Sequence, residues 1–209
     1  MATPAVPIEE FLALAIRHVN AGQRARARVL CEQAEVAHPP HAAVQQLLAV
    51  LSLQEGDATV ALRHADASLA LRPAHVPTLL IAGTARHQCG EWPAALSLLQ
   101  QVVALAPDQA DAWFQLALVQ HDLRDLDGAA RSLRRVLELA PQRADAATNL
   151  GIVLQDSGRI EAAISAYGHA YRLRGDTFGR IAHALAAANV GRLWLDLDAL
   201  RATLRSAPA

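Results

Sequence analysis

The chain contains no lysine and few aromatic residues. All 19 basic residues among its 209 residues are arginine, and 20 acidic residues leave a formal net charge of −1. This balance argues against a large nucleic-acid surface, which needs many uncompensated cations. Aromatic residues make up 4% and hydrophobic residues 53% of the chain. We therefore expect a core built mainly from Ala and Leu, which are strong helix formers.

Cysteine is also scarce, and long hydrophobic runs are absent. We expect the two cysteines, Cys31 and Cys89, to be free thiols, which suits a reducing compartment. No apolar run approaches the roughly 18 residues that a membrane-spanning helix needs. Residues 1–10 contain no Arg or Lys, the wrong charge for a secretory signal. The sequence therefore predicts a soluble, cytoplasmic protein.

Motifs of enzymes are missing from the chain. It contains no phosphate-binding glycine-rich loop, no His-Glu-x-x-His and no Gly-x-Ser-x-Gly. We predict no catalytic residues, no metal and no cofactor.

The chain does contain three ladders of residues with a period of 34. Proline recurs at Pro39, Pro73, Pro107 and Pro141; glycine at Gly22, Gly56, Gly90 and Gly158; and alanine at Ala27, Ala61, Ala95, Ala129 and Ala163. A shared period of this length predicts an array of stacked two-helix units.

The second unit illustrates how each repeat is built. A helix is expected over about residues 43–54, and Gly56 ends it because glycine accepts the left-handed conformation. Asp57 is placed to cap a second helix over about residues 59–71. Pro73 stops that helix because proline lacks the amide hydrogen and clashes with the preceding turn.

The pattern resembles the tetratricopeptide repeat family over nearly the whole chain. The matching residues are Trp113, Leu116, Ala117, Ala129, Leu133, Val136 and Pro141 in the fourth unit, and Leu150, Gly151, Gly158, Ala163, Tyr167 and Ala170 in the fifth. The resemblance implies an all-α, right-handed α-solenoid of about six helix-turn-helix repeats.

The period also predicts the repeat boundaries. We expect an N-terminal tail (1–7), five repeats (8–41, 42–75, 76–109, 110–143 and 144–177) and a divergent sixth repeat or C-terminal cap (178–209). The fourth repeat carries Arg124 in place of glycine, and the sixth carries Asp196 in place of alanine.

The last helix is expected to bury one stripe of leucines, namely Leu193, Leu197, Leu200 and Leu204, with Trp194 beside it. Two interpretations of Trp194 stand open. It contacts a partner or a second copy of the chain, or it folds over the last core layer.

The first helix of each repeat has a second apolar stripe, which begins with Leu12 and Ile16. In the resembled family such positions line a concave groove. The resemblance therefore implies a groove that binds a protein or peptide, and its predicted residues are Val50, Leu80, Thr84, His87, Phe114, Leu118, His121, Thr148, Ile152 and Gln155, with Asp111 and Asp122 beside them.

The predicted partner is an apolar segment with basic character. The positions beside the stripe are acidic (Asp111, Asp122, Asp145 and Asp156), and no Arg occupies a lining position. Members of the family that clamp a chaperone C-terminus use cations that are absent here. Members linked to glycosyltransferases carry an Asn ladder, of which Asn149 alone is present.

Histidine and arginine clusters raise the alternatives of a metal site and a nucleic-acid surface, and the spacing of these residues favours neither. His87 and His121 share a slot in neighbouring repeats, but helices stack about 8–10 Å apart, too far for shared zinc coordination. The arginines near residues 24–28 and 131–135 are expected to lie on a solvated convex face rather than on nucleic acid.

The sequence therefore predicts a non-catalytic scaffold that binds a peptide segment in its concave groove. Two alternatives remain: an accessory subunit that presents substrates to a bacterial glycosyltransferase or sulfotransferase, and a structural spacer that self-assembles through its ends, including the end near Trp194.

Overall fold

The computed structural model describes residues 7–187 and 196–208. Throughout these ranges the regular structure is helical, with no strand, as predicted for an α-solenoid. The chain divides into two compact units, Met1–Leu105 and Ala106–Ala209.

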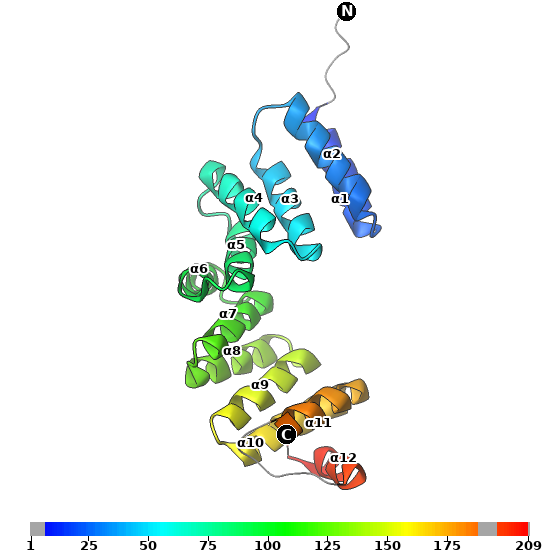
Figure 1. Cartoon of the computed structure of the whole chain (residues 1–209), viewed down its shortest axis with the longest axis vertical. Helices are drawn as coiled ribbons and strands as arrows, with labels where there is room; N and C mark the ends of the chain where they lie inside the picture. Colours follow the sequence, from blue (N-terminus) through cyan, green and yellow to red (C-terminus); the bar gives the residue numbers. More distant parts are fainter. Residues whose placement is uncertain (1–6, 188–195, 209) are drawn as a thin grey trace, which may run out of the picture. The chain divides into compact units, whose positions relative to one another are not determined.

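Each unit is a series of antiparallel helix pairs (Figure 1). The first unit contains α1 (Ile8–Asn20), α2 (Arg24–Ala37), α3 (Ala42–Gln54), α4 (Ala58–Leu71), α5 (Val76–Gln88) and α6 (Trp92–Leu105). The second contains α7 (Ala110–Asp122), α8 (Leu126–Leu139), α9 (Ala144–Asp156), α10 (Ile160–Leu173), a short 3₁₀ turn (Gly175–Thr177), α11 (Phe178–Ala187) and α12 (Leu197–Ser206).

The helices of the second repeat confirm the prediction to within one residue. Gly56, in the turn between α3 and α4, has a φ of +84°, the left-handed conformation that ends a helix. The side chain of Asp57 then accepts a hydrogen bond from the Val60 amide. A helix end and a helix start therefore fit into three residues, as the sequence indicated.

Arg124 adopts the same left-handed conformation as the glycines, with a φ of +62°. It stands in the glycine slot of the fourth repeat, between α7 and α8. Because a side chain in this region crowds the following carbonyl group, an arginine here is strained. The repeat geometry therefore prevails over the local preference of the residue.

Small residues hold the two helices of each pair close together. The recurring alanines of the second helices, Ala27, Ala61, Ala95, Ala129 and Ala163, are completely buried. In the fifth pair, Gly151 of α9 lies against the ring of Tyr167 on α10, the largest fully buried side chain of the described residues. A side chain on Gly151 would overlap that ring.

The last helix differs from its predicted form. Asp196 caps α12 by accepting hydrogen bonds from the amides of Asp198 and Ala199. Leu200 and Leu204 are buried, as expected, but Leu197 is 50% exposed. The prediction that Leu197 packs inward was wrong: it is the first residue of α12 and lies in an exposed stretch, residues 196–199, that ends at the buried Leu200. Leu193 and Trp194 lie outside the described residues.

Candidate functional site

An apolar hollow of about 220 Å³ opens between α1 and α3 in the first unit. Its walls are Leu12 and Ile16 of α1 and Ala43, Gln46, Leu47 and Val50 of α3. Leu12 and Ile16 are four residues apart, as are Gln46 and Val50, so each pair lies on one face of its helix. The hollow therefore lies along the second apolar stripe of the first helices, which begins with Leu12 and Ile16, and Val50 is among its walls.

The hollow carries no charge. Five of its six lining side chains are aliphatic, and Gln46 offers one amide that can both donate and accept hydrogen bonds. Ile16 is 50% exposed, which is high for a large aliphatic residue, and Val50 is half-buried. An exposed apolar concavity with one polar group is typical of a binding site for an apolar side chain.

The predicted groove residues of α5 do not line this hollow. Leu80, Thr84 and His87 are all half-buried. The Thr84 hydroxyl donates to the Leu80 carbonyl oxygen at 2.9 Å, which satisfies it within its own helix.

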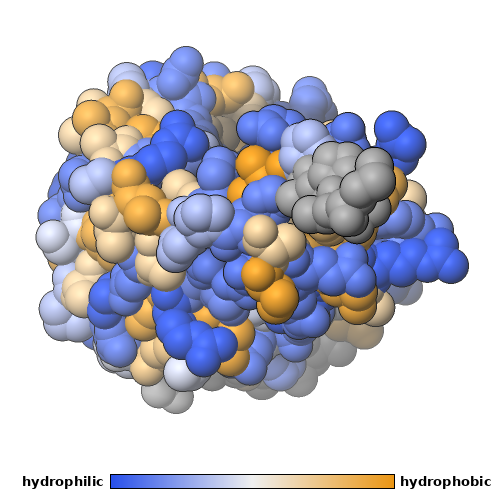
Figure 2. Space-filling view, turned by 90° about the horizontal axis from the view of Figure 1, so that it is seen from above, coloured by the Kyte–Doolittle hydropathy of each residue, from blue (hydrophilic) through white to orange (hydrophobic). Residues whose placement is uncertain are grey.

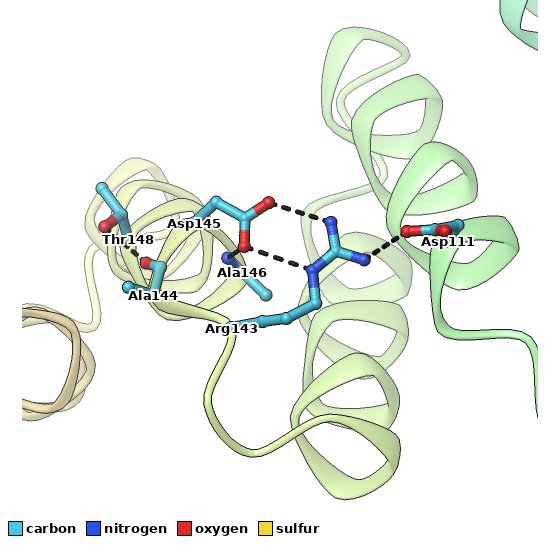
Figure 3. A network of polar contacts seen from close by, with 6 residues as sticks. All are labelled: Asp111, Arg143, Ala144, Asp145, Ala146 and Thr148. Carbon is cyan, nitrogen blue, oxygen red and sulfur yellow. Dashed lines mark hydrogen bonds and ion pairs between the residues drawn. The ribbon is translucent and has the colours of Figure 1, made fainter. Parts of the chain in front are cut away.

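In the second unit, the predicted groove residue Phe114 lies beneath an arginine. The guanidinium carbon of Arg143 is 4.5 Å from the centroid of the Phe114 ring. The same guanidinium bonds to Asp111 at 2.6 Å and, through two nitrogens, to Asp145 at 2.9 and 3.2 Å (Figure 3). Arg143 precedes α9 and Asp111 lies on α7, so the network links two successive repeats.

The paired charges shift one another's ionisation. The hydrogen bonds that Arg143 donates to Asp145 raise the pKa of the Arg143 guanidinium. The bonds from Arg143 in turn lower the pKa of the Asp145 carboxyl, and the bond from the Ala146 amide adds to this effect. Both groups are therefore charged at neutral pH.

A second polar cluster lies at the other end of these helices. Nε2 of His121 is 2.8 Å from a carboxylate oxygen of Asp156, and Arg124 approaches the same oxygen at 3.5 Å. His121, Leu118 and Ile152 are half-buried, whereas Asp122 is exposed. His121 is thus engaged by an acidic side chain.

Two predicted groove residues belong to the core instead. Thr148 is fully buried and donates to the Ala144 carbonyl oxygen at 2.8 Å. Gln155 is 3% exposed; it accepts from the Tyr167 hydroxyl and donates to the Ala184 carbonyl oxygen. Gln155 is thus held by α10 and α11, and the Thr148 hydroxyl is satisfied within α9, so both side chains are buried in this structure.

The acidic positions do not support the predicted basic character of the partner. Asp111 and Asp145 share Arg143, and Asp156 faces His121 and Arg124. Arg143 does not occupy a lining position itself, but its side chain reaches these carboxylates from the turn before α9. The negative charge is therefore largely compensated within the unit.

The sequence-based prediction missed Arg143 and the part that Ala43 and Leu47 play in the hollow. The 34-residue period could have placed Ala43 and Leu47 beside the stripe. No signal in the sequence indicates that Arg143 lies over an aromatic ring, because the path of a long side chain depends on tertiary contacts.

None of the helices in residues 7–187 and 196–208 combines the length and the hydrophobicity that a membrane span requires. Cys31 is buried, Cys89 is exposed, and both are free thiols.

Comparison with known proteins identifies the kind of repeat. Two family models, both described as tetratricopeptide repeat, match residues 87–149 and 122–209. No curated protein matches the sequence.

Solved structures of MamA have a similar fold. MamA 41-end from Desulfovibrio magneticus RS-1 superimposes with a TM-score of 0.73 at 19% identity, over 81% of this chain and 96% of that one. MamA of AMB-1 gives a TM-score of 0.71 at 23% identity, over 79% of this chain and 98% of that one. At this level of identity the similarity concerns the fold alone.

Proposed function

This chain belongs to the tetratricopeptide repeat family, and on that premise we propose that it binds an apolar segment of a partner protein in the hollow between α1 and α3. The repeats and the fold shared with MamA support a protein-interaction scaffold in general. The specific proposal rests on the uncharged, exposed hollow lined by Leu12, Ile16 and Val50.

The chemistry of the walls defines the ligand. A Leu, Ile or Phe side chain that leaves water for this hollow contributes about 1.5–3 kcal/mol when fully buried. A charged side chain finds no counter-ion among the lining residues and loses solvation on entry. We therefore propose an aliphatic or aromatic anchor residue.

The hollow can accept the anchor side chain from a partner segment in either of two backbone conformations. An amphipathic helix presents anchors at positions i and i+3 or i+4, and an extended segment presents them at every second residue. Gln46 can bond to the backbone of an extended segment, whose amide and carbonyl groups are not satisfied internally. The spacing of anchors in selected peptides distinguishes the two modes.

A peptide-display selection on the full chain, followed by fluorescence anisotropy with the enriched peptides, tests the proposal. The critical variant is Val50→Asp, which places a charge in the hollow. Its matched control is Val36→Asp, because Val36 lies on α2, is 91% exposed and does not line the hollow. Circular dichroism establishes that both variants are folded.

We expect peptides with one or two large apolar residues to be enriched. Val50→Asp should weaken their binding at least about 10-fold, equivalent to about 1.4 kcal/mol, and Val36→Asp should leave it unchanged. Equal affinity for both variants, or a selection that enriches no apolar motif, would contradict the proposal.

A further inference from the structure

One face of α1 differs from the equivalent face of the first helix in the second to fifth repeats. In α3 this face consists of Val44, Leu48 and Leu51, which are at most 2% exposed because the preceding repeat covers them. The same three positions in α5, α7 and α9 hold only Thr, Ala, Leu or Val, and none is more than 7% exposed. The equivalent positions in α1 are Glu10, Leu14 and Arg17.

These three residues form a charged and apolar stripe on the surface. Glu10 and Arg17 are exposed, and Leu14 is 39% exposed. Within the described residues, neither charged side chain takes part in an ion pair. Another repeat of the usual kind would bury both charges without partners, which costs several kcal/mol per ion. The face therefore suits a different occupant.

An apolar hollow of about 400 Å³ adjoins Leu14. It is lined by Leu14, Val29 and Leu30 and bordered by the polar side chains of His18, Arg26 and Gln33. On the side of the molecule seen in Figure 2, hydrophobic residues form separate patches among hydrophilic ones. A compact apolar centre with a polar rim is the usual composition of a protein interface.

The order of the three residues is self-complementary. Glu10, Leu14 and Arg17 follow the spacing i, i+4, i+7, so they share one side of α1. Leu14 lies near the midpoint of the stripe, and the two charges are about 10.5 Å apart along the axis. When a second α1 is laid antiparallel with Leu14 against Leu14, each Glu10 faces an Arg17 of the other copy.

We propose that this face binds a second copy of the chain in a two-fold symmetric dimer, with α1 packed antiparallel against α1. A two-fold interface brings the same patch of both subunits together, which is the arrangement that this palindromic stripe satisfies. The hollow beside Leu14 accepts apolar side chains of the other copy. The occupied face continues the surface through which the repeats already stack.

The charges at this interface remain near solvent, so they select the partner more than they strengthen binding. The dimer is accordingly weak and dissociates further as salt rises, because exposed ion pairs are screened.

Charge-reversed variants of the full chain test the pairing by sedimentation velocity, from about 1 μM to about 1 mM protein. Arg17→Glu gives a stripe with two acids, and Glu10→Arg gives one with two bases. Each variant alone should be monomeric because like charges face each other in the dimer. An equimolar mixture of the two should form a heterodimer, and the double variant with both charges exchanged should regain the homodimer.

The matched control is Glu9→Arg, which makes the same charge change one residue away from the stripe. It should dimerise as the wild type does. A wild type that stays monomeric at every concentration overturns the proposal. So does a dimer that persists in both single variants, or a mixture of them that remains monomeric.

Discussion

The guanidinium carbon of Arg143 lies 4.5 Å from the centroid of the Phe114 ring. This contact, together with the ion pairs to Asp111 and Asp145, joins the start of α9 to α7. Phe114, a predicted groove residue, is thus half-buried beneath a side chain of its own chain.

We expect Arg143→Gln to lower the free energy of unfolding by about 1–2 kcal/mol, the sum of one cation–π contact and two partly exposed ion pairs. Chemical denaturation followed by circular dichroism measures the change. The control is Arg131→Gln, because Arg131 is exposed on α8 and takes part in no ion pair within the described residues. Equal stability of the two variants would show that the network contributes nothing.

Arg124 offers a route to higher stability. Because it holds a left-handed φ of +62°, Arg124→Gly should raise the free energy of unfolding by about 1 kcal/mol, the strain that a side chain adds in this region. The small loss of its contact with Asp156 offsets part of the gain. Thermal unfolding should show a higher midpoint for this variant and a lower one for the reverse change, Gly158→Ala, in the equivalent turn. A lower midpoint for Arg124→Gly, or a higher midpoint for Gly158→Ala, would contradict the strain argument.

Two glycines in helices should respond in opposite ways to alanine. Gly151→Ala should destabilise the protein by about 1–3 kcal/mol because the added methyl group overlaps the buried Tyr167 ring. Gly179→Ala meets no atom within 4 Å and, because it is the second residue of α11, should stabilise by at most about 0.5 kcal/mol through helix propensity. Urea denaturation of the pair measures both effects. If both changes proved neutral, close packing between α9 and α10 would be excluded.

His64 should make the first unit less stable in mild acid. Burial lowers its pKa below the ordinary 6.5. At a pH between the folded pKa and the unfolded pKa of about 6.5, the unfolded chain binds more protons at His64 than the folded chain does. The contribution of His64 to stability is therefore complete above about pH 6.5 and is lost as the pH falls through the folded pKa. His64→Gln should reduce the slope of stability against pH between about 5 and 7.

A smaller slope should persist in that variant, because burial also lowers the pKa of His75. An unchanged slope after the His64 substitution would show that His64 is not desolvated in the folded protein.

The two cysteines should react at very different rates. Burial raises the pKa of the Cys31 thiol to about 11, so almost no thiolate forms at neutral pH, whereas Cys89 is exposed. A maleimide at pH 7 should label one site on the folded protein and two in denaturant, as measured by intact mass. Cys89→Ser should abolish the native labelling, and labelling of Cys31 at a similar rate would indicate frequent opening of α2.

Which helices form, and where they end, could be predicted from sequence because those features depend on local chemistry. Gly56, Asp57 and Pro73 act on the residues beside them, so the bounds of α3 and α4 follow within one residue. The buried alanines at the 34-residue spacing follow from the repeat in the same way. Stacking equivalent helices also placed Val50 in an apolar hollow.

Tertiary structure decided which of the predicted groove residues are exposed to solvent. Thr148 and Gln155 occupy groove positions in the period, yet both are buried, and Gln155 bonds to α10 and α11. Phe114 lies beneath an arginine from the turn that follows α8, and Leu197 lies outside the core because Asp196 starts α12 there. A repeat pattern specifies which face of a helix a residue occupies, since that depends on neighbours along the chain. Its exposure depends on the side chains that other helices and turns bring to that face, and only folding brings them together.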